Sequence, residues 1–425
     1  MSPVNQKLIN RLLPLGFVFL IGCTYFENEP IRIPAPEVPN PTTTLEANLV
    51  SVIPNKLNAN YWKTADYLEV SSQNLITSQV PTEDGLFNVS GTFNGKADFN
   101  KGKNPTIQLR AAYTSDSLYI HISWKDTTFS VSNSNWLFNG PTDPKKSGST
   151  TGWTSQRSDD LVALSFNMGG GKRDVWNWSL ALSEPLGFAI DMVDNGSGPV
   201  ADTGNKTYVR NIAGTDNRSG PKYDWDGVQQ ELTRKPAGFT ILDPGYYLLN
   251  KKLFTGDPIN GDAIYQAECI ACHGVTGDGN GTINPSFVAL NVPGQFNRLT
   301  RQALDAFAPN GGQHEGSTHY PTSETDRQDL FARLRGFSGI PGYYLENPSG
   351  SSSDVRAVSN VQLAKIDGFN SKGYSVLLVR ALNTSNADDI AFDPAKMIYE
   401  FHIYLGDNDH LNRIGLLNQQ LTFKP

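Results

Sequence analysis

Residues 106–126, TIQLRAAYTSDSLYIHISWKD, contain two runs of alternating apolar and polar side chains that meet at Ser115 and Asp116. Alternation with a period of two is typical of a strand that turns one face toward a core. Serine and aspartate favour a turn between two such strands. The stretch therefore predicts a β-hairpin, and it indicates the fold class of the residues around it.

The same alternation recurs on both sides of this hairpin. Residues 169–171 are three consecutive glycines between two of the runs, as expected for a turn between paired strands. Many short strands with turn residues between them indicate a mainly β protein with a β-sandwich-like architecture. The further predicted strands are residues 159–168, 172–182, 373–382, 396–405 and 419–423.

A block in the middle of the chain follows a different period. Helical spacing is found in residues 260–274, 300–310 and 323–337. Ser323 and Asp326 resemble a capping box at the start of the last of these helices. The block therefore predicts a small group of helices.

Two similar segments, DPGYYLLN (243–250) and IPGYYLENP (340–348), stand on either side of the helical block. We expect a small all-α domain, residues 249–340, inserted into a loop of the β domain, because such insertions are tolerated where chain ends lie close together. The β domain then has two parts, residues 46–248 and 341–425.

The helical block contains AECIACHGVTGDGNG, residues 267–281, with two of the three cysteines of the chain. A zinc site needs a second pair of ligands at similar spacing, and no other CxxC or HxxxH occurs. A disulfide between Cys269 and Cys272 would leave His273 without a role. A haem c uses all three residues, because the two thiols add to the porphyrin vinyl groups and the next imidazole ligates the iron. We therefore expect Cys269 and Cys272 to hold a covalent haem c, with His273 as an iron ligand.

Haem c is attached outside the bacterial cytoplasm, and the N-terminus fits that requirement. Lys7 and Arg11 accompany a short apolar run, residues 12–20, which is too short for an ordinary transmembrane helix. The run leads into Leu-Ile-Gly-Cys, which resembles the lipobox of bacterial lipoproteins and implies a diacylated Cys23. A plain signal peptide or membrane anchor that ends by chance in cysteine is the alternative.

The N-terminal residues thus have two expected parts. Residues 1–22 are interpreted as a lipoprotein signal peptide, and residues 23–45 as a proline-rich tether. Thr24, rather than an aspartate, follows the lipid site, which by the convention of this class favours the outer membrane. We expect an outer-membrane lipoprotein that faces the periplasm or the cell surface.

Residues 250–340 resemble a small class I cytochrome c. The similarity rests on CxxCH, on the Gly-x-x-Gly-x-Gly run that follows it, on Pro285 and on the final helix. The resemblance implies that the carbonyl of Pro285 accepts a hydrogen bond from His273 and fixes its ring. The sequence departs from the family at the sixth iron ligand, because none of the four methionines lies in the block.

The segment where that methionine would stand contains His314 and His319 instead. Pro321 follows His319 closely, as a proline often follows the methionine. His319 is therefore the expected sixth ligand and His314 the alternative. Two imidazoles favour ferric iron, and a six-coordinate iron suits electron transfer rather than oxygen chemistry.

The β segments on either side resemble the haem-binding domain of the ethylbenzene dehydrogenase γ subunit, a family that is also found fused to cytochromes c. The resemblance implies a second, b-type haem held between a methionine and a lysine. It is carried by residues 57–70, 109–126, 158–182, 373–384 and 399–409.

Met168 matches the methionine of that family, although a core methionine would look the same. The lysine has no counterpart, because Lys424 lies too close to the C-terminus, and His410 is the expected substitute. His121 and His402 lie on the polar faces of their strands, so we expect both to face solvent.

Composition limits the classes of function. The chain has 425 residues, a net charge of −7 and no basic run, so nucleic acid is not an expected partner. No Ser/His/Asp group or pair of carboxylates can be singled out, so catalysis by this chain is not expected. The sequence predicts an electron-transfer protein that passes single electrons between redox partner proteins.

Two alternatives stay open at this point. One is the electron-transfer subunit of a periplasmic molybdenum dehydrogenase or reductase complex. The other is a surface module that binds sugar or mineral through exposed aromatic residues such as Trp136, Trp153 and Trp225.

Overall fold

The computed structural model describes most of the chain after residue 39. The chain divides into two units, Met1–Val38 and Pro39–Pro425, and all described residues belong to the second. Among them, no helix is both long enough and apolar enough to cross a membrane. The described residues are 40–71, 73–74, 105–126, 130–138, 140, 152–215, 219–232, 241–283, 289–291, 300–307, 319–363, 371–396, 398–407 and 412–425.

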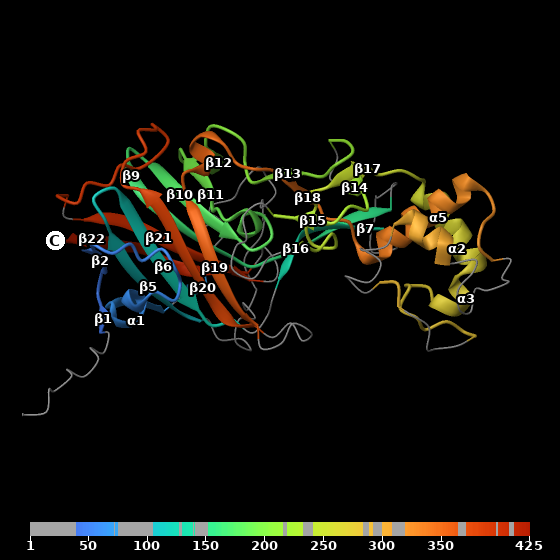
Figure 1. Cartoon of the computed structure of the whole chain (residues 1–425), viewed down its shortest axis with the longest axis horizontal. Coiled ribbons are helices and arrows are strands. Elements are labelled where there is room, and N and C mark those ends of the chain that lie inside the picture. The colour runs from blue at the N-terminus through green and yellow to red at the C-terminus, as the bar shows by residue number, and fades with distance from the viewer. Residues whose placement is uncertain are drawn as a thin grey trace, which may run out of the picture. The chain divides into compact units, whose positions relative to one another are not determined.

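One large sheet contains most of the strands (Figure 1). In the described residues it has 14 strands. Its main hydrogen-bonded order is β12 (Pro199–Ala201), β11 (Ile190–Asp194), β10 (Lys172–Ser179), β9 (Leu161–Gly169), β21 (Tyr399–Asp407), β22 (Asn412–Lys424), β2 (Leu45–Leu49), β5 (Thr106–Tyr113), β6 (Ser117–Trp124), β20 (Ser371–Ala381) and β19 (Arg356–Leu363). Three further strands join it at the sides: β3 (Tyr67–Ser71), β1 (Pro41–Thr42) and β4 (Gln73–Asn74).

The hairpin expected at residues 106–126 is confirmed as β5 and β6, which pair antiparallel. Its turn is closed by a hydrogen bond from the Thr114 N–H to the Ser117 carbonyl, with N and O 2.9 Å apart. β9 and β10 also pair antiparallel, and Gly169, Gly170 and Gly171 connect them with φ of 86°, 63° and 82°. Glycine adopts such left-handed angles without steric cost, so this turn depends on the three glycines.

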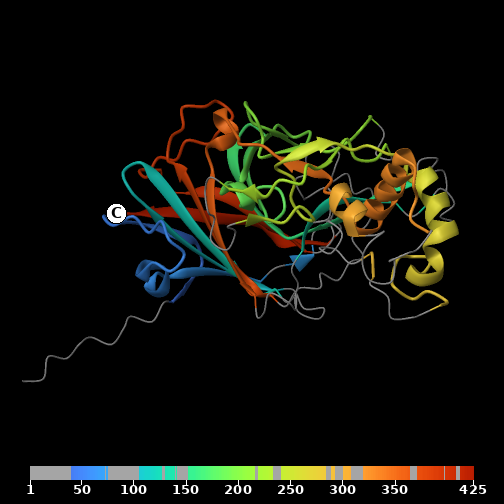
Figure 2. The ribbon, with the colours of Figure 1, turned by 45° about the vertical axis from the view of Figure 1, so that its right-hand side comes forward.

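An early strand of the sheet lies next to its last strand in sequence. β2 runs parallel to β22, with Leu45 opposite Leu421, and the two strands lie side by side in both views (Figure 1, Figure 2). On its other edge β2 runs parallel to β5, with Ala47 opposite Ala111. The sheet is therefore continuous only when the strands from both ends of the chain are in place.

The core is formed by the inward face of this sheet and is rich in aromatic side chains. Phe166 of β9 packs against Trp176 of β10, with ring centroids 4.7 Å apart. Burial of each large apolar side chain stabilises the fold by about 1.5–3 kcal/mol, so the cluster is the main source of stability. Its largest members include Trp124, Phe166, Trp176, Trp178, Tyr374 and Phe401.

Apart from α1 (Asn60–Thr64), the described α-helices lie between residues 258 and 338. Ser323 accepts a hydrogen bond from the Asp326 N–H at 3.4 Å, which confirms the expected cap of the last helix. A Cβ on Gly261 would overlap the Asp329 carbonyl, so this glycine permits the close packing of the first helix on the last. The helices are α2 (Pro258–Glu268), α3 (Ile270–His273), α4 (Arg301–Phe307) and α5 (Glu324–Ser338).

Two-stranded pairings surround the entry and exit of the helical segment. The two Gly-Tyr-Tyr-Leu segments meet there, because the Leu345 N–H donates to the Leu248 carbonyl at 2.8 Å. The chain thus leaves for the helices and returns from them at nearly the same point. The pairs are β13 (Tyr208–Arg210) with β18 (Tyr343–Leu345), β14 (Tyr223–Trp225) with β17 (Lys251–Leu253), β15 (Gln230–Glu231) with β16 (Ile241–Leu242), and β7 (Val131–Phe138) with β8 (Trp153–Asp159).

Two buried arginines of α5 connect it to the strands. Arg333 donates through Nη1 to the Phe138 carbonyl of β7 at 2.7 Å, and through Nε to Asp262 of α2 at 2.5 Å. Arg335 binds both carboxylate oxygens of Asp224 in β14, at 2.8 and 2.5 Å. Each guanidinium therefore has a carboxylate partner. Without one, a buried charge would strongly destabilise the fold.

His121 corrects one expectation from the sequence. It was expected to face solvent, but its side chain is only 7% exposed and stacks on Trp62 of α1, with ring centroids 5.3 Å apart. The α1 segment covers this face of β6, and strand alternation alone cannot reveal such a cover. His402 is half-buried, and its Nδ1 accepts a hydrogen bond from the Asn418 N–H at 3.0 Å.

Candidate functional site

α2 carries the chain to the two cysteines. Its first turn is capped by Asp257, which accepts from the Ile259 N–H at 2.8 Å, and Pro258 occupies the first helical position. Tyr265 is buried on the inner face of α2, and its hydroxyl donates to the Gly274 carbonyl at 2.7 Å. The helix thereby fixes both ends of the short segment that holds the cysteines.

Cys269, Cys272 and His273 lie together on one helical turn. The Cys269 carbonyl accepts from the Cys272 N–H at 3.2 Å and from the His273 N–H at 2.9 Å. All three side chains are half-buried, and the two thiols are free rather than bonded to each other. A disulfide is therefore not part of this structure, and the turn presents two thiols and one imidazole as a compact donor set.

A glycine-rich loop wraps closely around this turn. Its backbone returns to α3 through hydrogen bonds from the Gly279 N–H to the His273 carbonyl and from the Ile283 N–H to the Ala271 carbonyl, each at 3.0 Å. A Cβ on Gly281 would overlap the backbone of Ala271 and Cys272, so glycine is required for this approach. The Gly-x-x-Gly-x-Gly run after the motif thus has a direct structural role.

An apolar cluster supports the turn from one side. Cys269 and Ile270 pack against a core that includes Tyr265, Leu330 and Phe337. Burial, with smaller contributions from Glu268 and Cys272, raises the pKa of the Cys269 thiol to about 12. With nothing bound to it, this buried thiol is therefore protonated at physiological pH.

The donor set fits a haem c better than the alternatives. Among the described residues, Cys269 and Cys272 belong to no group of three or more such ligands whose atoms lie close enough together to hold a single metal ion. Val275 and Ile283 are 66% and 72% exposed, so apolar surface lies beside the motif. Cys269 and Cys272 would carry the thioether bonds, and His273 would provide an axial imidazole. A haem bound there would supply a one-electron iron couple.

His319 lies near this turn. Its Nδ1 is 2.7 Å from Oε2 of Glu268, the residue immediately before Cys269, and its side chain is 65% exposed. A carboxylate on Nδ1 fixes the orientation of the ring, as is common for metal-bound histidines. The structure therefore brings His319 to the haem motif, whereas His314 lies outside the described residues.

Only some of the other residues expected at haem or lipid sites lie in the part of the chain that the structure describes. Met168 stands at the end of β9, is partly buried and packs against the main core. Its expected partner His410 lies outside the described residues, as do Cys23 and Pro285. Lys424 pairs with Glu46 at 3.3 Å.

The aromatic residues considered for a binding surface are not exposed. Trp136 and Trp153 are buried, and Trp225 is half-buried with its Nε1 donating to the Val228 carbonyl at 2.6 Å. These side chains pack within the protein, so the alternative of a sugar- or mineral-binding face loses the residues on which it was based.

Comparison with known proteins supports the haem assignment. The Cytochrome c family model matches residues 259–334, which include α2, α3, α4 and most of α5. No curated protein matches the chain. The fold is therefore mainly β with a small helical cytochrome c domain, as the sequence predicted, and this family implies covalently bound haem c.

Proposed function

We propose that this protein is a lipid-anchored c-type cytochrome that passes single electrons between redox partner proteins outside the cytoplasm. The observation that carries the proposal is the turn on which Cys269, Cys272 and His273 stand together inside a cytochrome c domain. Catalysis of a substrate reaction is not part of the proposal.

His319 is proposed as the sixth iron ligand. Its hydrogen bond to Glu268 supports this role, because Glu268 directly precedes Cys269 and the bond holds the imidazole beside the haem motif. An iron with two imidazoles has no open position for a small molecule, which suits electron transfer. His314 is the alternative ligand.

A b-type haem in the β domain, with Met168 and His410 as ligands, is the second part of the proposal. Its support is the position of Met168 at the edge of an aromatic core, where an apolar haem would find packing partners. The packing of Met168 also has a purely structural explanation. An experiment that counts covalent and extractable haem separately distinguishes the two.

The experiment is a pyridine haemochrome assay combined with acid-acetone extraction of the purified protein. We expect about one haem per chain in the protein fraction and a reversible one-electron redox titration. Cys269→Ala with Cys272→Ala should abolish the covalent haem, because both thioether bonds are lost. Haem that stays with the denatured double variant would contradict the assignment.

The same extraction tests the second haem. About one haem per chain in the organic phase, lost in Met168→Ala but kept in Met192→Ala, would support the b-type site. Met192 is the control because it is a buried methionine in a different apolar cluster. An organic phase without haem would leave a single-haem cytochrome on a β scaffold.

A further inference from the structure

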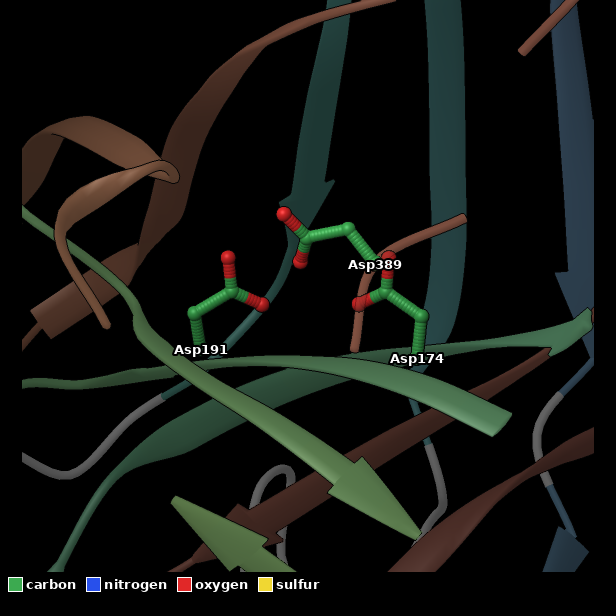
Figure 3. A group of neighbouring side chains, drawn as sticks. All are labelled: Asp174, Asp191 and Asp389. Atoms are coloured by element: carbon green, nitrogen blue, oxygen red, sulfur yellow. The ribbon is translucent and has the colours of Figure 1, made fainter. Parts of the chain in front are cut away.

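A group of carboxylates lies in the β domain, apart from the cytochrome c domain. Asp174 of β10, Asp191 of β11 and Asp389 of the segment after β20 point toward one another (Figure 3). One oxygen from each lies within 4.8 Å of the others. All three residues are buried, so water does not solvate their charges.

The strand register explains why two of these acids share one face. Asp191 lies directly opposite Trp176, and Asp174 is opposite Val193. Directly opposed residues share a face, and so do residues two apart in a strand, so Asp174, Trp176 and Asp191 all point into the core. Two adjacent strands therefore have acidic residues at positions that face the core, where apolar residues are normally found.

Arg380 of β20 offsets part of this charge. It contacts the Asp174 carboxylate directly, and its Nη1 lies 3.7 Å from Oδ1 of Asp389. One oxygen of each of these acids has a further donor: Ile390 N–H for Asp174 at 2.9 Å, and the Thr384 hydroxyl for Asp389 at 2.5 Å.

Asp191 has no comparable support. Its side chain is 0% exposed, and neither of its carboxylate oxygens has a hydrogen-bond partner among the described residues. Oδ1 of Asp174 and Oδ1 of Asp389 are also without a hydrogen bond there. Buried carboxylates are normally hydrogen-bonded, paired or bound to a metal, so these oxygens require an explanation.

The buried Asp202 gives a second, independent indication of a ligand site beside these three acids. It does not belong to the group of three, but its N–H donates to the Asp191 carbonyl at 3.2 Å across the strand pair. Asp202 is 5% exposed, and neither of its carboxylate oxygens has a hydrogen-bond partner in the described part of the chain. It extends the same face of β11 and β12 with another unpartnered acid.

We propose that Asp174, Asp191 and Asp389 bind one calcium ion, with Asp202 as a further oxygen ligand, direct or through water. The donors are all carboxylate oxygens, which hard divalent cations prefer over the softer metals that choose sulfur or imidazole. Calcium bonds oxygen at about 2.3–2.6 Å, so one ion spans oxygens up to about 5 Å apart. Magnesium demands near-ideal octahedral geometry and usually keeps several waters, which a buried set of carboxylates does not supply.

The proposed ion has a structural role. It connects the β10–β11 hairpin to the segment that follows β20, which are distant in sequence. The N–H of Ile390, the residue after Asp389, already joins this segment to Asp174 of β10. Loss of the ion should therefore loosen residues 382–392 and lower the stability of the β domain without removing the covalent haem.

The test uses the full-length protein, stripped with a chelator and then equilibrated with calcium chloride. Metal content is measured by mass spectrometry, and thermal unfolding is followed with calcium or with chelator. We expect about one calcium per chain and a higher melting temperature with calcium. At a calcium concentration 100-fold above the dissociation constant, the folded-to-unfolded ratio should rise about 100-fold.

Asp191→Asn is the decisive variant, because it keeps the shape of the side chain but removes the charge. Glu184→Gln is the matched control: Glu184 is also fully buried, but it accepts a hydrogen bond from Trp178 Nε1 at 2.6 Å outside the acidic group. Calcium should bind and stabilise the control and not the Asp191 variant. Terbium luminescence sensitised by Trp176, which lies opposite Asp191, gives a second readout of the same site.

Three results would overturn the proposal. The first is a wild-type protein that neither holds calcium nor gains stability from it, which would mean that protons neutralise the acids. The second is an Asp191→Asn variant that keeps both the calcium and its stabilising effect. If Asp191→Asn does not fold, Asp202→Asn takes its place, and unchanged calcium affinity in that variant would be the third.

Discussion

At the level of single residues, His319 combines an exposed imidazole with a hydrogen bond to the carboxylate of Glu268. We expect His319→Ala to make the reduced protein bind carbon monoxide, because the variant loses the proposed sixth ligand. Wild type should not bind carbon monoxide and should give the magnetic spectrum of a low-spin iron with two imidazoles. Absorption spectra with and without carbon monoxide measure the difference.

His314→Ala is the control for this prediction, because it removes the other histidine of the same segment. Carbon monoxide binding by the His314 variant alone would transfer the assignment to His314. If neither variant binds carbon monoxide and both keep the wild-type spectrum, the sixth ligand is a residue other than these two histidines.

His121 is a second residue with a measurable consequence. Burial, and the neighbouring charge of Arg110, lower its pKa from 6.5 to about 4. The unfolded chain therefore binds a proton more readily than the folded protein. The free energy of unfolding is therefore unaffected by the titration of His121 above pH 6.5. It falls by up to about 3 kcal/mol as the pH drops from 6.5 through about 4.

We expect His121→Phe to remove this loss, because phenylalanine keeps a ring against Trp62 and does not titrate. Urea unfolding of wild type and variant at several pH values between 7 and 4 measures it. Buried carboxyls such as Glu184 titrate in both proteins, so their contribution cancels in the difference. A difference in stability that does not change with pH would contradict the prediction.

Single residues also show where sequence reasoning ended. The CxxCH motif could be recognised from the sequence, because its three functional residues lie within five positions and on one helical turn. The contact between His319 and Glu268 depends on how the chain folds back, and no local pattern contains it. Asp174, Asp191 and Arg380 are charged residues at core-facing positions of apolar strands, and this pattern is visible in the sequence. Only the fold shows that the three side chains lie together.

At the level of elements, sequence patterns predicted β5, β6, β9, β10, β20 and β21 to within a few residues. Burial alternates along the first part of β5, so a period of two is preserved in its sequence, whereas β9 and β10 are buried on both faces and were identified by their apolar runs and the glycine turn between them. β22 was predicted only over residues 419–423, but it spans Asn412–Lys424. Its register shifts between Phe401 and Ile403 of its partner, and such an irregularity interrupts the alternation.

The helices were predicted more completely than the sheet order. α2, α4 and α5 depend on local spacing and caps such as Ser323, which a sequence displays. The pairing of β2 with β22 and β5 depends on contacts between distant segments, and alternation carries no information about partners. The cover of α1 over His121 was missed for the same reason.

At the level of the whole molecule, the proposed anchor is tested through Cys23. Cys23→Ala should block lipoprotein processing and release the protein from the membrane, because stable attachment requires more than one acyl chain and all of them depend on this residue. Cell fractionation and the mass of the protein measure both effects. A variant that matures normally and stays as membrane-bound as wild type would show that Cys23 is not the lipid site.

The parallel pairing of β2 with β22 has a consequence for biogenesis. Leu45 and Ala47 are synthesised long before Leu421, which lies opposite Leu45. Until then β2 has an unpaired backbone edge and uncovered apolar side chains, which favour aggregation. The sheet is therefore completed only after β22 has been made, and a chain that stops before β22 leaves one edge of β2 unpaired.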